Sequence, residues 1–452
     1  WTRSMAALGR KGCRSVRRPA QGRGPHGRLT GRGARLDSMD FDLPPDDDPR
    51  RLDVRAWLAA NPDPTGRELH TAGYVVPHWP APYGIDADPM QQVLIDDELR
   101  RAGVRRPENP IGIGWAAPTI AMAGSVEMKA RYLDPIFTGE EFWCQMFSEP
   151  DAGSDLANLA TRAVRDGDEY VVNGSKIWTS GGHMADFGIL IARTDPDVAK
   201  HKGISYFVCP MDLPGITMSP IVDMTSAHSF NQVFFDDVRI PASLLVGEEG
   251  DGWRLTRVTL ANERVSLSSA GSLWGAGPSA EDLLELVRLA GGTSDPVVRQ
   301  RLASLHCEAE VLRLNRLRTL SAQLAGREPG SEANIQKAMA DDHGQHVMEL
   351  AKDLAGTSGM LVGSGPAGRL DASRAEGTTE NRLITGEFPD VSSIWHYGYV
   401  FSPALTLGGG TFAVQRNIIA ERVLGLPREP DAQRGLAWSE ARASESHAGR
   451  SS

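Results

Sequence analysis

The spacing of apolar residues divides the chain into a helical part, a strand-like part and a second helical part. From about residue 50 to 140 the pattern favours helices, and Pro89 stands where one of them can begin. Helical spacing returns at Trp253. Between these parts, from residue 160 to 241, short apolar runs bounded by turn residues predict strands at 170–172, 188–192 and 205–208.

Two dipeptides in the strand-like part, Asp166-Gly167 and Asn173-Gly174, are typical of tight hairpin turns. Such turns need positive φ at both central residues, which Asp, Asn and Gly tolerate best. We therefore expect a hairpin at each dipeptide, and a small β domain between the two helical parts.

The C-terminal part is expected to form a helical bundle. One helix should begin with Asp295 as N-cap and Pro296 at its first position, a second should span residues 331–356, and a third residues 411–424, closed by Gly425. The expected divisions of the chain are a basic segment 1–38, a helical domain 39–140, a β domain 141–252, a helical bundle 253–428 and a loose tail 429–452.

Composition excludes several classes of function. The 452 residues, 40% of them hydrophobic, suffice for two or three domains, and a net charge of −10 gives no general basic surface for nucleic acid. No apolar run approaches the ~20 residues that a membrane-spanning helix needs. The four cysteines form no Cys-x-x-Cys pair, so we expect no metal, no disulfide framework and a cytoplasmic location. They are Cys13, Cys144, Cys209 and Cys307.

The first 38 residues differ from the remainder. They carry ten basic residues and one acid, Asp37, for a net charge of +9, which leaves −19 for the rest of the chain. They are rich in Gly, lack the apolar core of a secretory signal and are expected to be disordered. Two interpretations stay open: a basic targeting or nucleic-acid-binding arm, or upstream sequence translated ahead of a true start at Met39. The second is favoured because the chain begins with Trp1 and Met39 opens an ordinary acidic stretch.

A loop of small and hydroxyl-bearing residues precedes the strand-like part. Its backbone N–H groups can approach an anion closely, because Ala, Gly and Ser have little bulk. In isolation, an ordinary turn before a strand is the favoured interpretation. The loop is Phe147-Ser148-Glu149-Pro150-Asp151-Ala152-Gly153-Ser154-Asp155.

Taken with two later stretches, this loop resembles the acyl-CoA dehydrogenase family over roughly residues 70–428. The resemblance implies an N-terminal helical domain, a central β-barrel or sandwich and a C-terminal four-helix bundle. It also implies an FAD-dependent oxidoreductase of lipid catabolism, which forms a 2,3 double bond in an acyl-CoA thioester as in β-oxidation and passes electrons to an electron-transfer flavoprotein. The matching stretches are the loop with Asn173-Gly174-Ser175-Lys176-Ile177-Trp178-Thr179-Ser180, then residues 234–241 with 247–253, and then Gly409-Gly410-Thr411 with residues 415–422.

The same resemblance implies contacts for individual residues. Trp178 would flank the isoalloxazine ring, Thr179 would hydrogen-bond the flavin, and residues 147–155 would lie along the flavin and its pyrophosphate. Ser154 would also meet the substrate, and Arg264 would meet the substrate or position the base. The implied FAD contacts are Gln145, Phe147, Ser148, Gly153, Ser154, Trp178, Thr179, Ser180, Thr411 and Ala413, and the substrate contacts are Ser154, Arg264 and Gly410.

Removal of the α-proton of a thioester needs a carboxylate, for which the family uses two alternative positions. One stands immediately before the Gly-Thr of the C-terminal motif, where this chain has Gly409 and therefore no side chain. The other is a Glu-Arg dipeptide on the first long helix after the β domain, here Glu263-Arg264. We therefore predict Glu263 as the catalytic base.

Periodicity supports Glu263 independently. On a helix from about residue 255 to 274, it shares an apolar face with Leu260, Leu267 and Trp274. Burial of an unpaired charge is costly, and it raises the pKa of a carboxyl group toward the range of a useful base. A structural Glu paired with an arginine is the alternative interpretation.

The expected mechanism follows the family. Glu263 would take the pro-R α-proton while the β-hydrogen leaves as hydride to flavin N5. The α-proton becomes acidic enough only if donors hold the carbonyl oxygen, where negative charge develops. By resemblance these donors are the flavin ribityl 2′-hydroxyl and the backbone N–H of Gly409.

Three departures from the family pattern lie toward the C-terminus. Polar residues of the last motif are replaced by Phe412-Ala413-Val414, the Arg-x-x-Phe-Gly segment is not recognisable between residues 274 and 296, and the Gln-x-x-Gly-Gly element corresponds at best to 353–357. Loosely held FAD, or a site shared between subunits of a homo- or hetero-oligomeric dimer or tetramer, would follow. The alternatives are therefore a non-catalytic or half-site subunit, and an acyl-CoA oxidase or flavin monooxygenase on the same fold.

Overall fold

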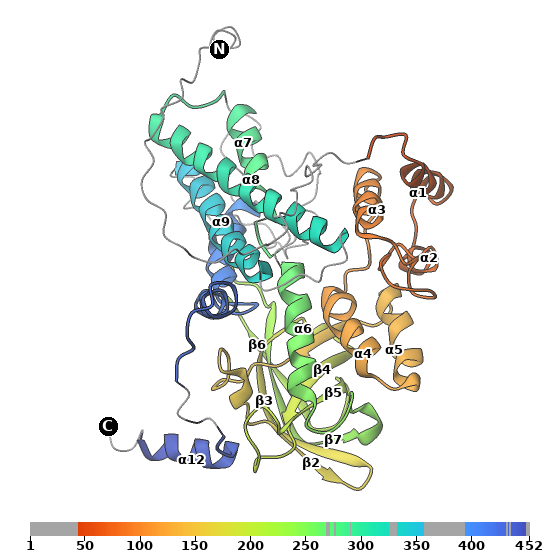
Figure 1. The fold of residues 1–452 in the computed structure, drawn as a ribbon, viewed down its shortest axis with the longest axis vertical. Helices are drawn as coiled ribbons and strands as arrows, with labels where there is room; N and C mark the ends of the chain where they lie inside the picture. Colours follow the sequence, from red (N-terminus) through yellow and green to blue (C-terminus); the bar gives the residue numbers. More distant parts are fainter. Residues whose placement is uncertain are drawn as a thin grey trace, which may run out of the picture. The chain divides into compact units, whose positions relative to one another are not determined.

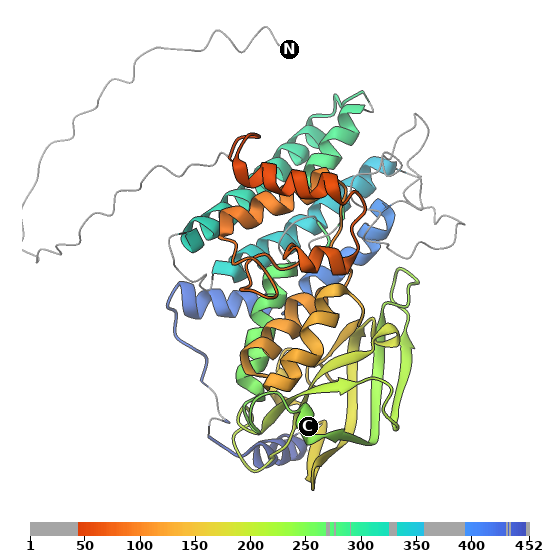
Figure 2. The same ribbon diagram turned by 90° about the vertical axis from the view of Figure 1, so that its right-hand side faces the viewer.

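The computed structural model describes residues 44–267, 272–274, 277–289, 291–324, 332–356, 394–430, 433 and 435–448. The basic segment 1–38 lies outside these ranges. The described residues form helices, then a sheet, then helices again, as Figures 1 and 2 show. The three-part fold expected from the sequence is confirmed. No described helix has the length and apolar character needed to cross a membrane.

The N-terminal helices begin where the capping residues predict. Helix α3 starts at Pro89, and the Asp88 carboxylate accepts a hydrogen bond from the Gln91 N–H at 2.8 Å. Ser125 caps α5 in the same way, through the Met128 N–H. The elements are α1 Pro49–Ala60, α2 Gly66–Thr71, α3 Pro89–Arg101, the π-helix η1 Gly112–Ala116, α4 Ala117–Ala123 and α5 Val126–Thr138.

Seven strands form one sheet in the order β1-β4-β2-β3-β7-β6, with β5 paired to β4. Strand β1 runs parallel to β4, and β3 pairs antiparallel with both β2 and β7. The strands are β1 Trp143–Met146, β2 Arg162–Asp166, β3 Glu169–Ser180, β4 Phe187–Arg193, β5 Ile204–Pro210, β6 Ile216–Ile221 and β7 Phe230–Pro241.

The two expected hairpin turns have different outcomes. Strands β2 and β3 do form a hairpin, but its two-residue turn is Gly167-Asp168, and only Gly167 has positive φ. The turn expected at Asn173-Gly174 is wrong, because both residues lie inside β3 at a register shift against β7. Gly174 has φ +147°, and a Cβ there would lie 2.7 Å from the Thr161 Cα. The dipeptide instead forms a β-bulge, at a point where the backbone of β3 passes close to Thr161.

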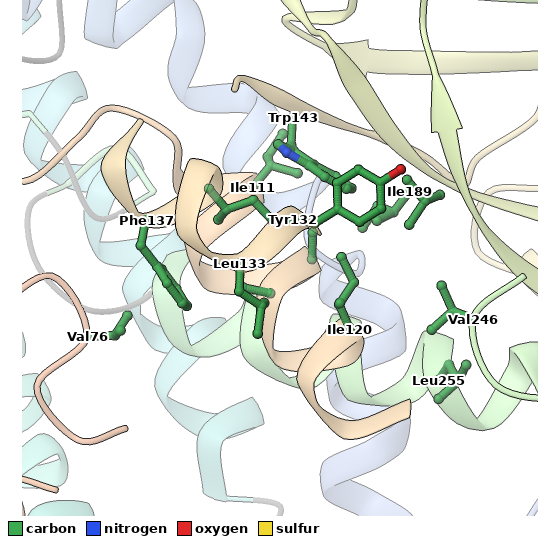
Figure 3. Close-up of a cluster of buried hydrophobic side chains, with 14 of the residues drawn as sticks. Val76, Ile111, Ile120, Tyr132, Leu133, Phe137, Trp143, Ile189, Val246 and Leu255 are labelled. Carbon is green, nitrogen blue, oxygen red and sulfur yellow. The ribbon is translucent and has the colours of Figure 1, made fainter. Parts of the chain in front are cut away.

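A large apolar core lies where the N-terminal helices meet the sheet (Figure 3). Trp143, the first residue of β1, is fully buried and packs edge-on against Tyr132 of α5, with ring centroids 5.5 Å apart. Ile189 of β4 joins the same core, whereas Leu190 faces a second core on the other side. Strand β4 is therefore buried on both faces.

The C-terminal part contains the expected helices with changed boundaries. Asp295 caps α8 by accepting from the Val297 N–H at 2.8 Å, as predicted. The elements are α6 Gly252–Leu267, α7 Ala280–Leu289, α8 Pro296–Leu324, α9 Glu332–Ala355, α10 Ile394–Phe401, α11 Phe412–Ile418, the π-helix η9 Ile419–Val423 and α12 Trp438–Ala448.

Two predicted helices are shorter or less regular than expected. Helix α6 ends at Leu267, and Trp274 is a turn residue with φ +50°, so it does not extend the face of Glu263. The helix expected over 411–424 consists of α11, with Thr411 as its N-cap, followed by the π-helix η9. Gly425 follows with φ +69° and ends it, as predicted.

The tail expected to be loose contains an ordered helix. Helix α12 contacts the β domain through Trp438, whose Nε1 donates to Asn158 Oδ1 at 3.0 Å. The Arg193 guanidinium lies over the Trp438 ring, 4.4 Å from its centroid. The Trp438 N–H also donates to the Val198 carbonyl at 2.8 Å. The polar composition of the tail therefore did not predict this attachment, which depends on a single aromatic residue.

Replacement of Trp143 tests the main core. Trp143→Ala should lower the free energy of unfolding by about 3–5 kcal/mol, because it leaves a large cavity between α5 and β1. Trp143 Nε1 has no hydrogen-bond partner. Trp143→Phe should therefore lower the free energy of unfolding by clearly less, because it removes some buried apolar area but no hydrogen bond. Urea unfolding curves of the two variants check this, and equal losses would contradict it.

Candidate active site

Helix α6 carries Glu263 between the N-terminal helices and the sheet. One turn earlier, Thr259 Oγ1 lies 3.1 Å from the Tyr206 hydroxyl of β5 and 2.9 Å from Thr119 Oγ1 of α4. All three of these side chains are buried. Because α6 is fixed on both sides here, the direction in which Glu263 projects is fixed as well.

The Glu263 carboxylate is buried, with 7% of the residue exposed. Gln145 of β1 donates from Nε2 to Glu263 Oε2 at 3.2 Å. Burial raises the pKa of Glu263 above its ordinary value, against the opposing effects of the Gln145 hydrogen bond and the charges of Arg264 and Lys337. Burial likewise lowers the pKa of Arg264. The site thus holds a carboxyl group whose proton affinity is increased.

Gly409 lies directly beside this carboxylate. A Cβ at position 409 would be 3.6 Å from Glu263 Oε1, 3.0 Å from Lys337 Cε and 2.5 Å from Leu267 Cδ1. Gly409 also has φ +67°, which disfavours any side chain. The structure therefore has room for one carboxylate at this point, and it comes from α6.

A buried ion pair on α9 supports the segment before Gly409. Lys337 is fully buried and donates from Nζ to Asp341 Oδ2 at 2.6 Å, and also to the carbonyls of Leu405 and Gly408, both at 3.2 Å. Burial raises the pKa of Asp341 to about 7, although the Lys337 charge opposes it. Sequence reasoning missed this pair, whose only signal is the i, i+4 spacing of two opposite charges on a predicted helix.

A second buried ion pair shapes the loop after β1. Lys176 of β3 donates from Nζ to Glu149 Oε1 at 2.8 Å and to the Phe147 carbonyl at 3.0 Å. Glu149 also accepts from the N–H groups of Ala160 and Thr161. Although burial acts to raise the pKa of Glu149, Lys176 and these donors outweigh it, and the pKa is lowered. These contacts attach the loop firmly to strand β3 of the sheet.

Residues 178 and 179 present features that suit a flat, polar cofactor. Trp178 is 56% exposed and has φ +61°, an uncommon conformation for a bulky residue at a register shift in β3. Thr179 is fully buried, yet its Oγ1 has no hydrogen-bond partner. An exposed ring next to an unsatisfied buried hydroxyl fits a ring system that carries hydrogen-bonding atoms, as a flavin does.

The remaining predicted site residues vary in exposure. Gln145 contacts Glu263 directly, and the Ser148 carbonyl accepts from the Ile177 N–H at 2.9 Å, which brings the loop beside the Trp178 strand. Fully or partly buried positions are Phe147, Ser148, Ser180, Arg264, Gly410 and Thr411, and exposed positions are Gly153, Ser154 and Ala413.

No group of three His, Cys, Asp or Glu side chains suited to a metal ion occurs in the part of the chain that the structure describes.

The raised pKa of Glu263 makes a prediction about stability. A carboxyl group with a raised folded-state pKa stabilises the protein below its unfolded pKa, and that contribution is lost as the pH rises through the folded pKa. Wild type should therefore lose stability relative to Glu263→Gln as the pH increases from about 4 to 8. Melting temperatures of both proteins across this range check the sign, and a pH-independent difference would contradict it.

Comparisons with known proteins identify the family to which the chain belongs. Three domain models of the acyl-CoA dehydrogenase family match in order: the N-terminal domain at residues 49–140, the middle domain at 144–238 and the C-terminal domain at 250–424. Acyl-CoA dehydrogenase FadE34 of Mycobacterium tuberculosis is 39% identical over 360 residues, which are 80% of this chain. The matched region is only 46% of FadE34, so this chain spans less than half of that relative's length.

A further relative and two solved structures match over most of their length. Acyl-CoA dehydrogenase IpdE1 of Mycobacterium tuberculosis is 36% identical, over 83% of this chain and 88% of IpdE1. The ChsE4-ChsE5 complex from Mycobacterium tuberculosis has a TM-score of 0.67 at 30% identity, covering 86% of this chain and 100% of the matched one. The structure of the Tcur3481-Tcur3483 steroid ACAD has a TM-score of 0.67 at 30% identity, and the match covers 84% of this chain and 97% of the matched one. The chain is therefore a member of the acyl-CoA dehydrogenase family of oxidoreductases.

Proposed function

We propose that this protein catalyses the FAD-dependent α,β-dehydrogenation of an acyl-CoA thioester, with Glu263 as the base. The observation that carries the proposal is the buried Glu263 carboxylate beside Gly409, a position that has no room for a side chain. The same observation supports the predicted choice between the two base positions of the family.

Glu263 accepts the α-proton at Oε1, the oxygen closer to Gly409, while Oε2 keeps its hydrogen bond from Gln145. Burial strengthens the base, because a desolvated carboxylate gains more from protonation than an exposed one does. The carboxyl group that results is neutral, and its burial carries no charge penalty. Gln145 is therefore a positioning residue, which keeps the second oxygen fixed during the transfer.

The negative charge that develops on the thioester oxygen needs a donor close to Glu263. We assign this role to the Gly409 N–H, because the backbone of residue 409 lies beside the Glu263 carboxylate. Gln415, fully buried, donates from Nε2 to the carbonyls of Gly409 and Gly410, both at 3.3 Å, and so keeps this segment rigid. A donor fixed before the reaction stabilises the developing enolate without reorganisation.

The cofactor that the family implies is FAD, which when bound supplies the hydride acceptor for the β-hydrogen. Trp178 would lie against its ring system, and Thr179 Oγ1 would gain the partner that it lacks. The Glu149–Lys176 ion pair holds the loop on the sheet, and the small residues of this loop would lie along the pyrophosphate. An electron-transfer flavoprotein is the acceptor that we propose.

Ring-bearing acyl groups are the substrate class that we propose first. One structure at 30% identity is described as a steroid ACAD, and it covers most of this chain. A steroid-derived acyl thioester keeps the same reacting carbons as a fatty acyl thioester, so the roles of Glu263 and Gly409 would be unchanged.

A half-site subunit of a hetero-oligomer is the second candidate. Thr411 already uses its hydroxyl to accept from the Val414 N–H at 3.3 Å as the N-cap of α11, and the nearby Ala413 offers no polar atom. The side chains of Thr411 and Ala413 therefore have little polar contact to contribute to a cofactor. A similar structure is a complex of two different chains, ChsE4 and ChsE5.

Removal of the base tests the leading proposal. Anaerobic titration with a panel of straight, branched and steroid-derived acyl-CoAs should bleach the flavin of the wild type, because the substrate becomes oxidised. Glu263→Gln should bind the same ligands without bleaching, since the amide cannot accept the α-proton. The absorbance of the oxidised flavin measures both outcomes.

Equal bleaching in the two proteins would remove Glu263 from the mechanism. Wild type that is colourless and inactive alone, but active after co-expression with a second chain of the family, would favour the half-site candidate.

Thr179 gives a separate test of the cofactor. Thr179→Val should leave the stability of the FAD-free protein unchanged or slightly higher, because its hydroxyl has no partner there. The affinity for FAD should fall about three- to tenfold, the worth of one hydrogen bond. Flavin fluorescence during titration of the FAD-free protein measures this, and an unchanged dissociation constant would contradict the contact.

A further inference from the structure

Lys337 makes contacts that an ion pair alone does not require. Its ammonium group donates to both oxygens of Asp341, at 2.8 and 2.6 Å, and also to the carbonyls of Leu405 and Gly408. Lys337 is fully buried, and Asp341 is 2% exposed. The charge is therefore held in place away from solvent and directed at the segment before Gly409.

The Gly408 carbonyl and the Gly409 N–H belong to one peptide unit. A hydrogen bond accepted by the carbonyl of a peptide polarises the unit and makes its N–H a stronger donor. An ammonium group is a stronger donor than a neutral amide, because its hydrogen bonds are charge-assisted. Lys337 therefore acts on the electronic state of the Gly409 N–H as well as on its direction.

We infer that Lys337 is a positioning residue for the reaction, which orients and polarises the Gly408–Gly409 peptide so that its N–H stabilises the enolate oxygen. The inference rests on the proposed function, in which Gly409 supplies the backbone donor. No proton moves at Lys337: Glu263 takes the α-proton, the C–H electron pair passes to the thioester carbonyl, and the charge on its oxygen lies near the polarised N–H.

The surroundings of Gly409 support a role in the reaction over a purely structural one. A Cβ at position 409 would be 3.0 Å from Lys337 Cε and 3.6 Å from Glu263 Oε1, so the side chains of the lysine and of the base border the same small volume. The positive charge of Lys337 also acts to lower the pKa of Glu263. A cation beside the base weakens it, and this arrangement is useful where the same cation stabilises the product of proton removal.

The test uses acetoacetyl-CoA, a 3-oxoacyl thioester whose enolate has its own absorption. In the wild-type holoenzyme the pKa of the bound ligand should lie below its value in water, because the Gly409 N–H stabilises the enolate. The double variant Lys337→Met/Asp341→Asn removes the cation without leaving a buried unpaired carboxylate. We expect it to raise the pKa of the bound ligand by about one unit, a tenfold loss of enolate stabilisation. We expect kcat to fall about ten- to hundredfold, somewhat less than the loss of a whole oxyanion donor.

Two controls separate this effect from general damage. S-butyl-CoA has a methylene group in place of the carbonyl, so its dissociation constant should stay within about twofold of wild type. Lys352→Met removes another lysine from α9, one that lies 3.1 Å from His396 Nδ1, and should leave the pKa of bound acetoacetyl-CoA unchanged.

An unchanged ligand pKa in the double variant would overturn the inference, and so would an equal loss of affinity for S-butyl-CoA. Failure of the wild type itself to lower the pKa of acetoacetyl-CoA would instead remove Gly409 from the proposed function.

Discussion

The burial of one carboxylate is the constraint on which the site depends. An isolated charge inside a protein is so costly that it becomes neutral or finds compensating groups. For Glu263 those groups come from different parts of the chain: Gln145 from β1, Arg264 from α6 and Lys337 from α9. The environment of the carboxylate therefore exists only when the sheet, α6 and the C-terminal helices pack together. None of these parts contains the site by itself.

The neighbourhood of Gly409 imposes a second condition. Leu267, Lys337 and Glu263 already occupy the space into which a side chain at position 409 would extend. The packing that places a carboxylate of α6 here therefore also requires a glycine at position 409. The backbone at 409 remains close to the base while the side-chain volume belongs to residues of α6 and α9. This packing brings the backbone of residue 409 close to the carboxylate of Glu263.

Local sequence signals predicted much of the fold. The features that they did not predict depend on contacts between residues far apart in the sequence. Asp295 and Pro296 mark a helix start through chemistry within four residues, and the structure has that start. Asn173-Gly174 carries an equally clear local signal, but its backbone conformation is used for a bulge against Thr161, which only the folded sheet brings near. Lys337 and Asp341 resemble a surface pair in the sequence, because helix periodicity does not reveal which neighbours cover a face. The motif and the periodicity both indicated Glu263, whereas its contact with Gln145 depends on the pairing of distant elements. The roles of the site residues stay predictions.

Helix α12 connects the C-terminal tail to the β domain. The chain leaves the β domain through α6 and contacts it again at Trp438. There Asn158, Arg193 and Val198 contact the indole ring and the backbone N–H of Trp438. The C-terminal tail is therefore attached to the β domain by the contacts of Trp438. The last described helix therefore belongs to the packing of the β domain, although the whole helical bundle separates the two in the sequence.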